Sequence, residues 1–399
     1  MTTPANSGRF LPLSRADAEK RGWDEIDFVL VSGDAYVDHP SFGTALIGRL
    51  LEAAGYRAGI IPQPDWTDVE AFRIFGRPRL AFFISAGNVD SMVNHYTAQR
   101  RPRREDAYSP GGAAGKRPDR ALIVYSGMVK QAYKGVPVIL GGLEASLRRL
   151  SHYDYWTNSV RRSVLVDSKA DLLIYGMGES QVLAIARQLA EGTPVGDITG
   201  VRGTVYRSSR QAPSAAAALL PGFDAASRDK SSFLEHFRLQ YKNTDPVTAK
   251  PLIEPLPHGV LVQNPPAPPL PQEELDRIYE LPYRREAHPV YKDLGGVPAL
   301  QEVQFSIVSS RGCFGDCSFC SLTFHQGKLV RSRSHKSILR EAATLTRHPA
   351  FKGYIHDVGG PTANFRHPAC RKQAEKGACS DKQCLYPVPC PALQADHRD

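Results

Sequence analysis

The N-terminal part of the chain alternates between short apolar runs and apolar residues at helical spacing. Phe28–Ser32 is a continuous apolar run, Phe42, Leu46 and Leu50 recur every fourth residue, and a second apolar run lies at 58–61. A continuous apolar run is typical of a strand that is covered on both faces of a parallel sheet. The pattern therefore predicts a β-α-β unit.

Three further apolar runs follow, at 80–85, 136–140 and 171–175, and each ends in glycine or small residues. In open α/β sheets, ligands bind beyond the carboxyl ends of the strands. We therefore expect residues 1–205 to form a flavodoxin-like, doubly wound α/β domain whose strand ends face a ligand or a second domain.

The periodicity weakens after residue 205. A proline tract at 264–271 indicates a stiff, extended connector, and residues 273–281 are expected to form a short helix. We predict an irregular connector over 206–289.

The last part of the chain has the order of elements found in a β/α barrel. An apolar run at 303–308 precedes a cysteine-rich loop, Ser334 can cap a helix, and a second strand from Tyr354 ends in glycines. A barrel unit takes roughly 30 residues, so the residues from 303 on are too few for a whole barrel. We expect 290–399 to be the N-terminal part of a barrel, either from a longer protein or completed by another chain.

Three cysteines, Cys313, Cys317 and Cys320, have the spacing C-x-x-x-C-x-x-C. Cysteine thiolates are the usual ligands of iron–sulfur clusters, and three of them leave one iron of a four-iron cube without a protein ligand. An open coordination position on a metal leaves room for a substrate or cosubstrate. The loop is therefore predicted to be a chemical site.

These motifs resemble those of one enzyme family. The segments 311–325, 331–334 and 357–364, and further upstream 34–43, 141–150 and 175–179, resemble the YgiQ-type branch of the radical S-adenosylmethionine (SAM) superfamily. The resemblance implies a radical SAM barrel after the flavodoxin-like domain. It implies no particular substrate or reaction.

The resemblance also implies cofactors and site residues. Cys313, Cys317 and Cys320 would bind a four-iron four-sulfur cluster, SAM would chelate the open iron, and its cleavage would give a 5′-deoxyadenosyl radical. An electron donor such as flavodoxin or ferredoxin is implied, while no catalytic acid or base is. The cofactor-binding residues that it implies are Phe319, Gly359, Gly360 and Pro361.

Each of these residues has an expected role. Phe319 would lie near the adenine or the cluster, or be a core aromatic. Gly359 and Gly360 would meet the SAM amino group. The usual acidic residue is Pro361 here, so backbone carbonyls would carry that contact. Gly312 and Gly315 are expected to adopt positive φ.

The N-terminal domain resembles the cobalamin-binding domain of many radical SAM enzymes. A histidine ligand would need the motif D-x-H-x-x-G, which Asp38, His39 and Gly43 miss by their spacing. We therefore do not expect cobalamin, and we expect His39 at a helix entry or on the surface.

Other cysteines leave an alternative open. All seven cysteines lie at or after Cys313, and their odd number in a chain without an export signal favours reduced thiols. Cys370, Cys379, Cys384 and Cys390 could bind an auxiliary cluster or zinc, or remain unligated. One of them could also complete a structural zinc or iron site with the first three, in a scaffold without catalysis.

Charge and hydropathy bear on partners. The net charge is +9, and basic side chains gather between Arg100 and Arg120. Such a patch attracts RNA through its charge, without sequence specificity. The interpretation that we favour is instead a solvated loop. No apolar run approaches the roughly 20 residues of a membrane-spanning helix, so we expect a cytoplasmic protein without a membrane partner.

Overall fold

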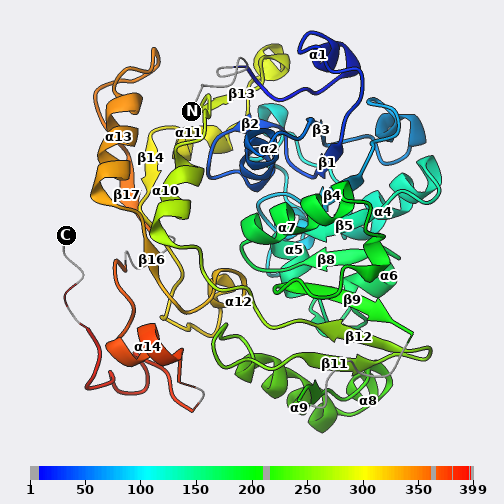
Figure 1. Ribbon diagram of the computed structural model, residues 1–399, viewed down its shortest axis with the longest axis vertical. Coiled ribbons are helices and arrows are strands. Elements are labelled where there is room, and N and C mark those ends of the chain that lie inside the picture. The colour runs from blue at the N-terminus through cyan, green and yellow to red at the C-terminus, as the bar shows by residue number, and fades with distance from the viewer. Residues whose placement is uncertain (1–8, 210–215, 361–364, 380, 395, 397–399) are drawn as a thin grey trace. The chain divides into compact units, whose positions relative to one another are not determined.

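The computed structural model describes residues 9–209, 216–360, 365–379, 381–394 and 396 (Figure 1). The chain divides into two compact units. The first comprises Met1–Ile174, Gly178–Thr199 and Leu281–Gln304, and the second comprises Tyr175–Met177, Gly200–Glu280 and Phe305–Asp399. The domain boundaries predicted at 205 and 289 stay a prediction.

The first unit contains five parallel strands in the order β8-β5-β4-β1-β3. Their bounds are β1 Phe28–Ser32, β3 Ala58–Pro62, β4 Ala81–Ser85, β5 Val138–Gly141 and β8 Leu172–Ile174. This is the flavodoxin-like order of a doubly wound sheet. The predicted fold class of this part is confirmed, because the continuous apolar runs form buried strands of one parallel sheet.

Helices connect these strands. The long ones are α2 (Gly43–Ala53), α4 (Ala121–Ala132) and α7 (Glu179–Ala190), and α2 packs against α7. The shorter elements are α1 Arg15–Glu19, β2 Val37–Asp38, η1 Val69–Phe72, α3 Ser91–His95, η2 Pro110–Gly112, α5 Gly142–Leu147, β6 His152–Asp154, β7 Ser159–Arg161, α6 Val164–Asp167, η3 Val195–Asp197, β13 Glu286–Ala287, η4 Pro289–Leu294 and α11 Ala299–Val303.

The carboxyl end of β1, where this fold binds ligands, is filled by the chain itself. The cavity beside Ser32, Asp34 and Asn88 has a volume of only about 10 Å³. His39 follows at the entry to α2 and is fully buried, and its Nδ1 accepts a hydrogen bond from Ser41 N at 3.0 Å. Its predicted place at a helix entry is confirmed, whereas the surface alternative is wrong.

The second unit contains the strands β10-β11-β12-β9, of which β11, β12 and β9 pair antiparallel. Their bounds are β9 Thr204–Ser208, β10 Ala218–Leu219, β11 Leu252–Pro255 and β12 Val260–Gln263, and the helices are α8 Phe223–Arg228, α9 Lys230–Lys242 and α10 Gln272–Tyr279. The prediction of an irregular connector was therefore wrong over most of its length. The proline tract does lack helix and strand, and the helix expected from residue 273 is α10.

The barrel-like part of this unit is a β-α-β unit. β14 (Ser306–Val308) pairs parallel with β17 (Asp357–Gly359), and α13 (His335–Leu345) lies between them in sequence, with Ser334 as its N-cap. Both strands begin three residues later than their apolar runs. Phe305, Ile307 and Leu345 form the core of this part. The predicted start of a β/α barrel is confirmed in its order of elements.

The remaining elements flank the cysteines. They are β15 Ser310–Arg311, α12 Leu322–Gln326, β16 Arg331–Ser332 and α14 Arg371–Lys376. Across the part of the chain that the structure describes, no helix combines the length and the apolar character needed to cross a membrane.

Candidate functional site

The cysteine loop lies between two short strands that close its base. β15 and β16 pair antiparallel, with Arg311 opposite Arg331. Cys313 N donates a hydrogen bond to Gly327 O at 3.0 Å. Gly312 has a φ of 87°, and a Cβ there would lie 2.4 Å from Leu329 O. Only glycine fits this close crossing, as predicted for Gly312.

The three cysteines of the loop form no disulfide bond and differ in exposure. Cys313 is buried, Cys317 is exposed and Cys320 is half-buried, and Cys320 N donates to Cys317 O at 2.9 Å. The loop thus brings Cys317 and Cys320 onto one tight turn.

Gly315 keeps space between two of these thiols. A Cβ on it would lie 3.3 Å from Cys313 Sγ and 3.7 Å from Cys317 Sγ. The positive φ predicted for Gly315 was wrong, since the left-handed residue between Cys313 and Cys317 is Asp316, with a φ of 53°. The lack of a side chain at Gly315 therefore leaves space beside Cys313 Sγ, whereas Asp316 supplies the left-handed conformation of the turn.

Phe319 lies between Cys317 and Cys320 and is 91% exposed. The alternative of a core aromatic is therefore wrong. An exposed phenylalanine beside two thiols leaves a large apolar surface free for a ligand or partner.

The sequence did not predict the ion pair between Asp316 and Lys328, which holds the cysteine loop together with Tyr241 of α9. Lys328 Nζ lies 2.7 Å from Asp316 Oδ2, and the same carboxylate accepts a hydrogen bond from the Tyr241 hydroxyl. Lys328 Nζ also lies 4.6 Å from the centre of the Tyr241 ring. Burial is the largest single influence and favours the neutral amine, but the hydrogen bonds and charges of Asp316 and Tyr241 together raise the pKa of Lys328.

The two glycines at the end of β17, Gly359 and Gly360, lie beside the chain that leads into the cysteine loop. Ser309 N donates to Gly359 O at 2.9 Å, and a Cβ on Gly360 would lie 2.5 Å from Ser310 Oγ. The backbone at Gly360 therefore closely approaches Ser310, just before the cysteine loop. Pro361 lies outside the described residues.

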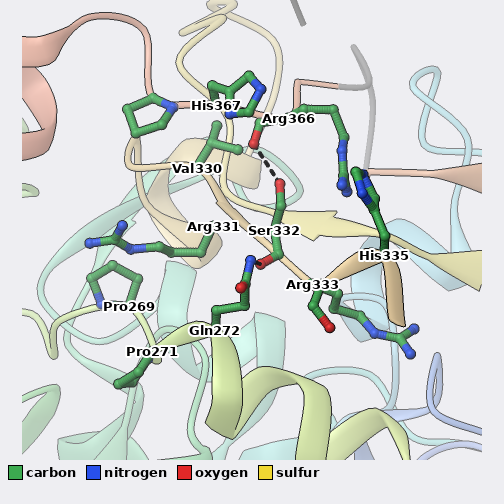
Figure 2. A pocket seen from close by; sticks show the side chains of 12 residues that line it. Pro269, Pro271, Gln272, Val330, Arg331, Ser332, Arg333, His335, Arg366 and His367 are labelled. Atoms are coloured by element: carbon green, nitrogen blue, oxygen red, sulfur yellow. Dashed lines mark hydrogen bonds between the residues drawn. The ribbon is translucent and has the colours of Figure 1, made fainter. Parts of the chain in front are cut away.

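A basic pocket of about 840 Å³ adjoins β16 (Figure 2). Its lining residues are Pro269, Pro271, Gln272, Val330, Arg331, Ser332, Arg333, Ser334, His335, Arg366, His367 and Pro368. Figure 2 shows Ser332 between two partners: its hydroxyl donates to Arg366 O at 2.6 Å, and its carbonyl accepts from Gln272 Nε2 at 3.1 Å.

The arginines of the pocket differ in their partners. Arg333 is 1% exposed, forms an ion pair with Glu341 and donates to Val308 O at 3.0 Å, and burial lowers its pKa to about 10. Arg331 Nε is buried without a hydrogen-bond partner in the described part of the chain. Arg333 is thus structural, whereas Arg331 keeps a donor for an anionic ligand.

The basic stretch of the first unit is only partly at the surface. Arg117 is buried and lies 2.9 Å from both Asp34 Oδ1 and Asp106 Oδ2. Arg100, Arg101, Arg103 and Arg104 remain exposed.

Comparisons with known proteins place the chain among relatives. The family described as Radical SAM N-terminal matches residues 10–306, a stretch that ends before Cys313. A UPF0313 protein of Clostridium botulinum (strain 657 / Type Ba4) is 53% identical over 98% of this chain and 61% of that protein. One of Clostridium perfringens (strain ATCC 13124) is 52% identical over 99% and 60%. The chain thus spans about three-fifths of the length of these relatives.

Two solved structures of the radical SAM methyltransferase TsrM from Kitasatospora setae are also similar, at 15% identity. One, with cobalamin and a 4Fe-4S cluster bound, covers 84% of this chain and 47% of that chain with a TM-score of 0.46. The other, with tryptophan substrate and the SAM analogue aza-SAM, covers 80% and 45% with a TM-score of 0.44.

Proposed function

This chain belongs to the Radical SAM N-terminal family, and we propose that it is a radical SAM enzyme whose Cys313, Cys317 and Cys320 bind a four-iron four-sulfur cluster. Given one electron from a reductant and bound together with SAM, such a cluster would supply the chemistry that turns SAM into a 5′-deoxyadenosyl radical able to abstract hydrogen from a substrate. The proposal leaves substrate and reaction class open.

The observation that carries the proposal is the donor set of the loop. Three cysteines, none of them in a disulfide bond, lie on one segment whose base is closed by the β15–β16 pair, and a Cβ on Gly315 would lie only 3.3 Å from Cys313 Sγ. Thiolates are the ligands that iron–sulfur clusters use. The donor chemistry therefore suits a cluster held by three ligands. Cluster binding would draw the three thiols together, because among the described residues no three Cys, His, Asp or Glu side chains are grouped so that they could hold a metal ion.

The loop also serves electron delivery in this proposal. Cys313 is buried and anchors one side, while Cys317 is exposed. An exposed ligand gives a reductant such as flavodoxin or ferredoxin a short path to the metal. Phe319, which is free of the core, would cover the adenine or the cluster once ligands are bound.

SAM would bind along the carboxyl ends of β14 and β17. Backbone carbonyls at Gly359, Gly360 and Pro361 would accept hydrogen bonds from its amino group, since no acidic side chain is present at these positions. Arg331, with its unpartnered Nε, would donate to an anionic group of SAM or of the substrate.

The proposal is tested by anaerobic reconstitution with iron and sulfide. We expect Cys317→Ala to contain about four irons fewer per chain than the unchanged protein, because the loop then lacks one of its three ligands. Ser318→Ala is the matched control, since it changes the same exposed turn without removing a thiol.

Two results would contradict the proposal. One is equal iron in Cys317→Ala and the unchanged protein. The other is a colourless site that holds zinc with metal–sulfur distances near 2.3 Å, which indicates a structural zinc scaffold.

A further inference from the structure

Four cysteines lie outside the proposed cluster loop, on the segment that contains α14. Cys370 is the N-cap of α14, and its Sγ accepts a hydrogen bond from Gln373 N at 3.4 Å. Cys379 follows the helix, and Cys384 and Cys390 flank the next turn. All four are free, half-buried thiols.

The backbone brings the two ends of this segment together. Gln394 N donates to Ala369 O at 2.7 Å, and Cys390 N donates to Cys384 O at 2.9 Å. Cys384 and Leu393 also pack against a buried cluster that includes Ala369. Cys370, Cys384 and Cys390 therefore lie on chain segments that contact one another.

The segment is also tied to the rest of the second unit. Ala378 N donates to Asp245 Oδ2 at 2.9 Å, directly before Cys379. Gln373 Nε2 donates to Lys328 O at 3.3 Å, and Gln383 Nε2 lies 3.5 Å from the Tyr241 hydroxyl, directly before Cys384. Three separate contacts thus fix the backbone beside the cysteines.

Cys379 lies back against the helix that Cys370 caps. Lys372, two residues after Cys370, has its Nζ 3.5 Å from Cys379 Sγ. Four thiolates repel one another unless a cation lies between them, and a metal supplies that charge.

We propose that Cys370, Cys379, Cys384 and Cys390 together bind a second metal centre, separate from the cysteine loop and held by four thiolates. Thiolate ligands select zinc or an iron–sulfur cluster, and four of them close the site, which makes it structural or electron-transferring.

In this proposal the four thiols come together only when the metal binds. Among the described residues, no three Cys, His, Asp or Glu side chains are grouped so that they could hold a metal ion. Tyr386 and Val388, in the turn between Cys384 and Cys390, are 70% and 75% exposed. A turn with so few core contacts can draw inward as its thiolates bind metal, because binding energy is available for local folding.

The test uses the full chain carrying Cys317→Ala, so that iron of the cysteine loop does not contribute. After anaerobic purification and reconstitution, we expect about one zinc or about four irons with inorganic sulfide per chain. Adding Cys384→Ala or Cys379→Ser should remove at least half of that metal. Val388→Ala, in the same exposed turn, should retain it.

Two cysteine variants are used because loss of metal in one of them could result from misfolding. Cys384 packs against the buried cluster, whereas Cys379 is not among the residues of that cluster, so Cys379→Ser tests ligation without removing a core contact. Metal content that is unchanged in Cys379→Ser overturns the proposal. Brown protein with sulfide identifies a cluster, and colourless protein with zinc identifies a zinc site. Neither result depends on whether Cys313, Cys317 and Cys320 bind iron.

Discussion

Asp316 and Lys328 hold the cysteine loop through a charge pair that is largely shielded from water. Their side chains are only 6% and 11% exposed, and Tyr241 from α9 contacts both. Asp316 also has the left-handed backbone conformation that turns the chain between Cys313 and Cys317. The positions of Cys313 and Cys317 thus depend on the conformation of Asp316, which is not one of the proposed cluster ligands.

We predict that Lys328→Met loosens this loop. The substitution leaves the Asp316 carboxylate with the Tyr241 hydroxyl but without its cation, and breaking a buried ion pair costs about 3 kcal/mol. The amides of residues 312–330 should then exchange with deuterium roughly 100-fold faster, as measured by mass spectrometry.

The control for Lys328→Met is Arg371→Met. Arg371 pairs with Glu375 on the surface of α14, where both side chains are mostly exposed, and such pairs contribute less than about 1 kcal/mol. Unchanged exchange of residues 312–330 in Lys328→Met would show that the pair does not hold the loop.

Two elements of the first unit, β1 and the loop after it, carry a buried carboxyl group. Asp34 lies 2.9 Å from the Arg117 guanidinium and accepts a hydrogen bond from Asn88 N at 2.7 Å. Burial nevertheless raises the pKa of Asp34 to about 6. The folded chain therefore holds a proton on this group between about pH 4 and 6, where the unfolded chain has released it.

We predict that this group makes the first unit more stable as the pH falls from 6 to 4. The free energy of unfolding should gain up to about 1.4 kcal/mol per pH unit from this group, and Asp34→Asn should remove that gain. Tryptophan fluorescence during urea unfolding measures it, because the three tryptophans, at positions 23, 66 and 156, all lie in this unit.

The difference between the unchanged protein and Asp34→Asn isolates this group from other carboxyls. Asp24→Asn is the control, since Asp24 is 92% exposed. A difference that does not vary between pH 4 and 6 would contradict the raised pKa.

Elements differ in how well their sequence predicts them. β1 and β3 were predictable because continuous apolar runs need burial on both faces. β10, β11 and β12 are two to four residues long, too short to show a period, and α9 buries only His236. Their structure depends on tertiary partners that sequence patterns do not record.

In the site too, local sequence predicts some features, while others depend on tertiary contacts. Cysteine spacing predicts which thiols share a loop, and the crossing at Gly312 follows from a tight turn. Asp316 pairs with Lys328, 12 residues later, and accepts from Tyr241 on α9, while Arg333 pairs with Glu341 on α13. Neither the ion pair nor the burial of Arg333 could therefore be predicted from local sequence. The exposure of Phe319 could not be predicted either, because apolar residues are usually buried.

At the scale of the whole molecule, the charge of +9 does not translate into one continuous basic surface. Arg117 neutralises two buried carboxylates, and Arg120 pairs with Asp154 at 3.0 Å. Four exposed arginines between 100 and 104 remain for a polyanion, and one of them, Arg100, already lies over the ring of Tyr155 at 4.7 Å. RNA would bind these arginines through salt-sensitive attraction.

The chain also combines a flavodoxin-like first unit with the cysteine loop of the second unit, and each is a candidate cofactor site. We predict that the first unit binds no cobalamin. The cavity beside Asp34 and Asn88, at the carboxyl end of β1, holds about 10 Å³, room for about one water and far less than a corrin ring. Asp38 is engaged by Arg49, and His39 Nδ1 accepts from Ser41 N.

Gel filtration with hydroxocobalamin in micromolar excess measures this, read by cobalt content and by the absorption of the corrin in the protein peak. TsrM, which has been solved with cobalamin bound, is the positive control. We expect cobalt to elute with TsrM but not with this chain. One cobalt per chain in the protein peak would mean that β1 and the loop after it rearrange to admit the ring. The Asp34–Arg117 ion pair would then have to break before the ring could bind, and Asp34→Asn, which weakens that pair, should raise the affinity for cobalamin.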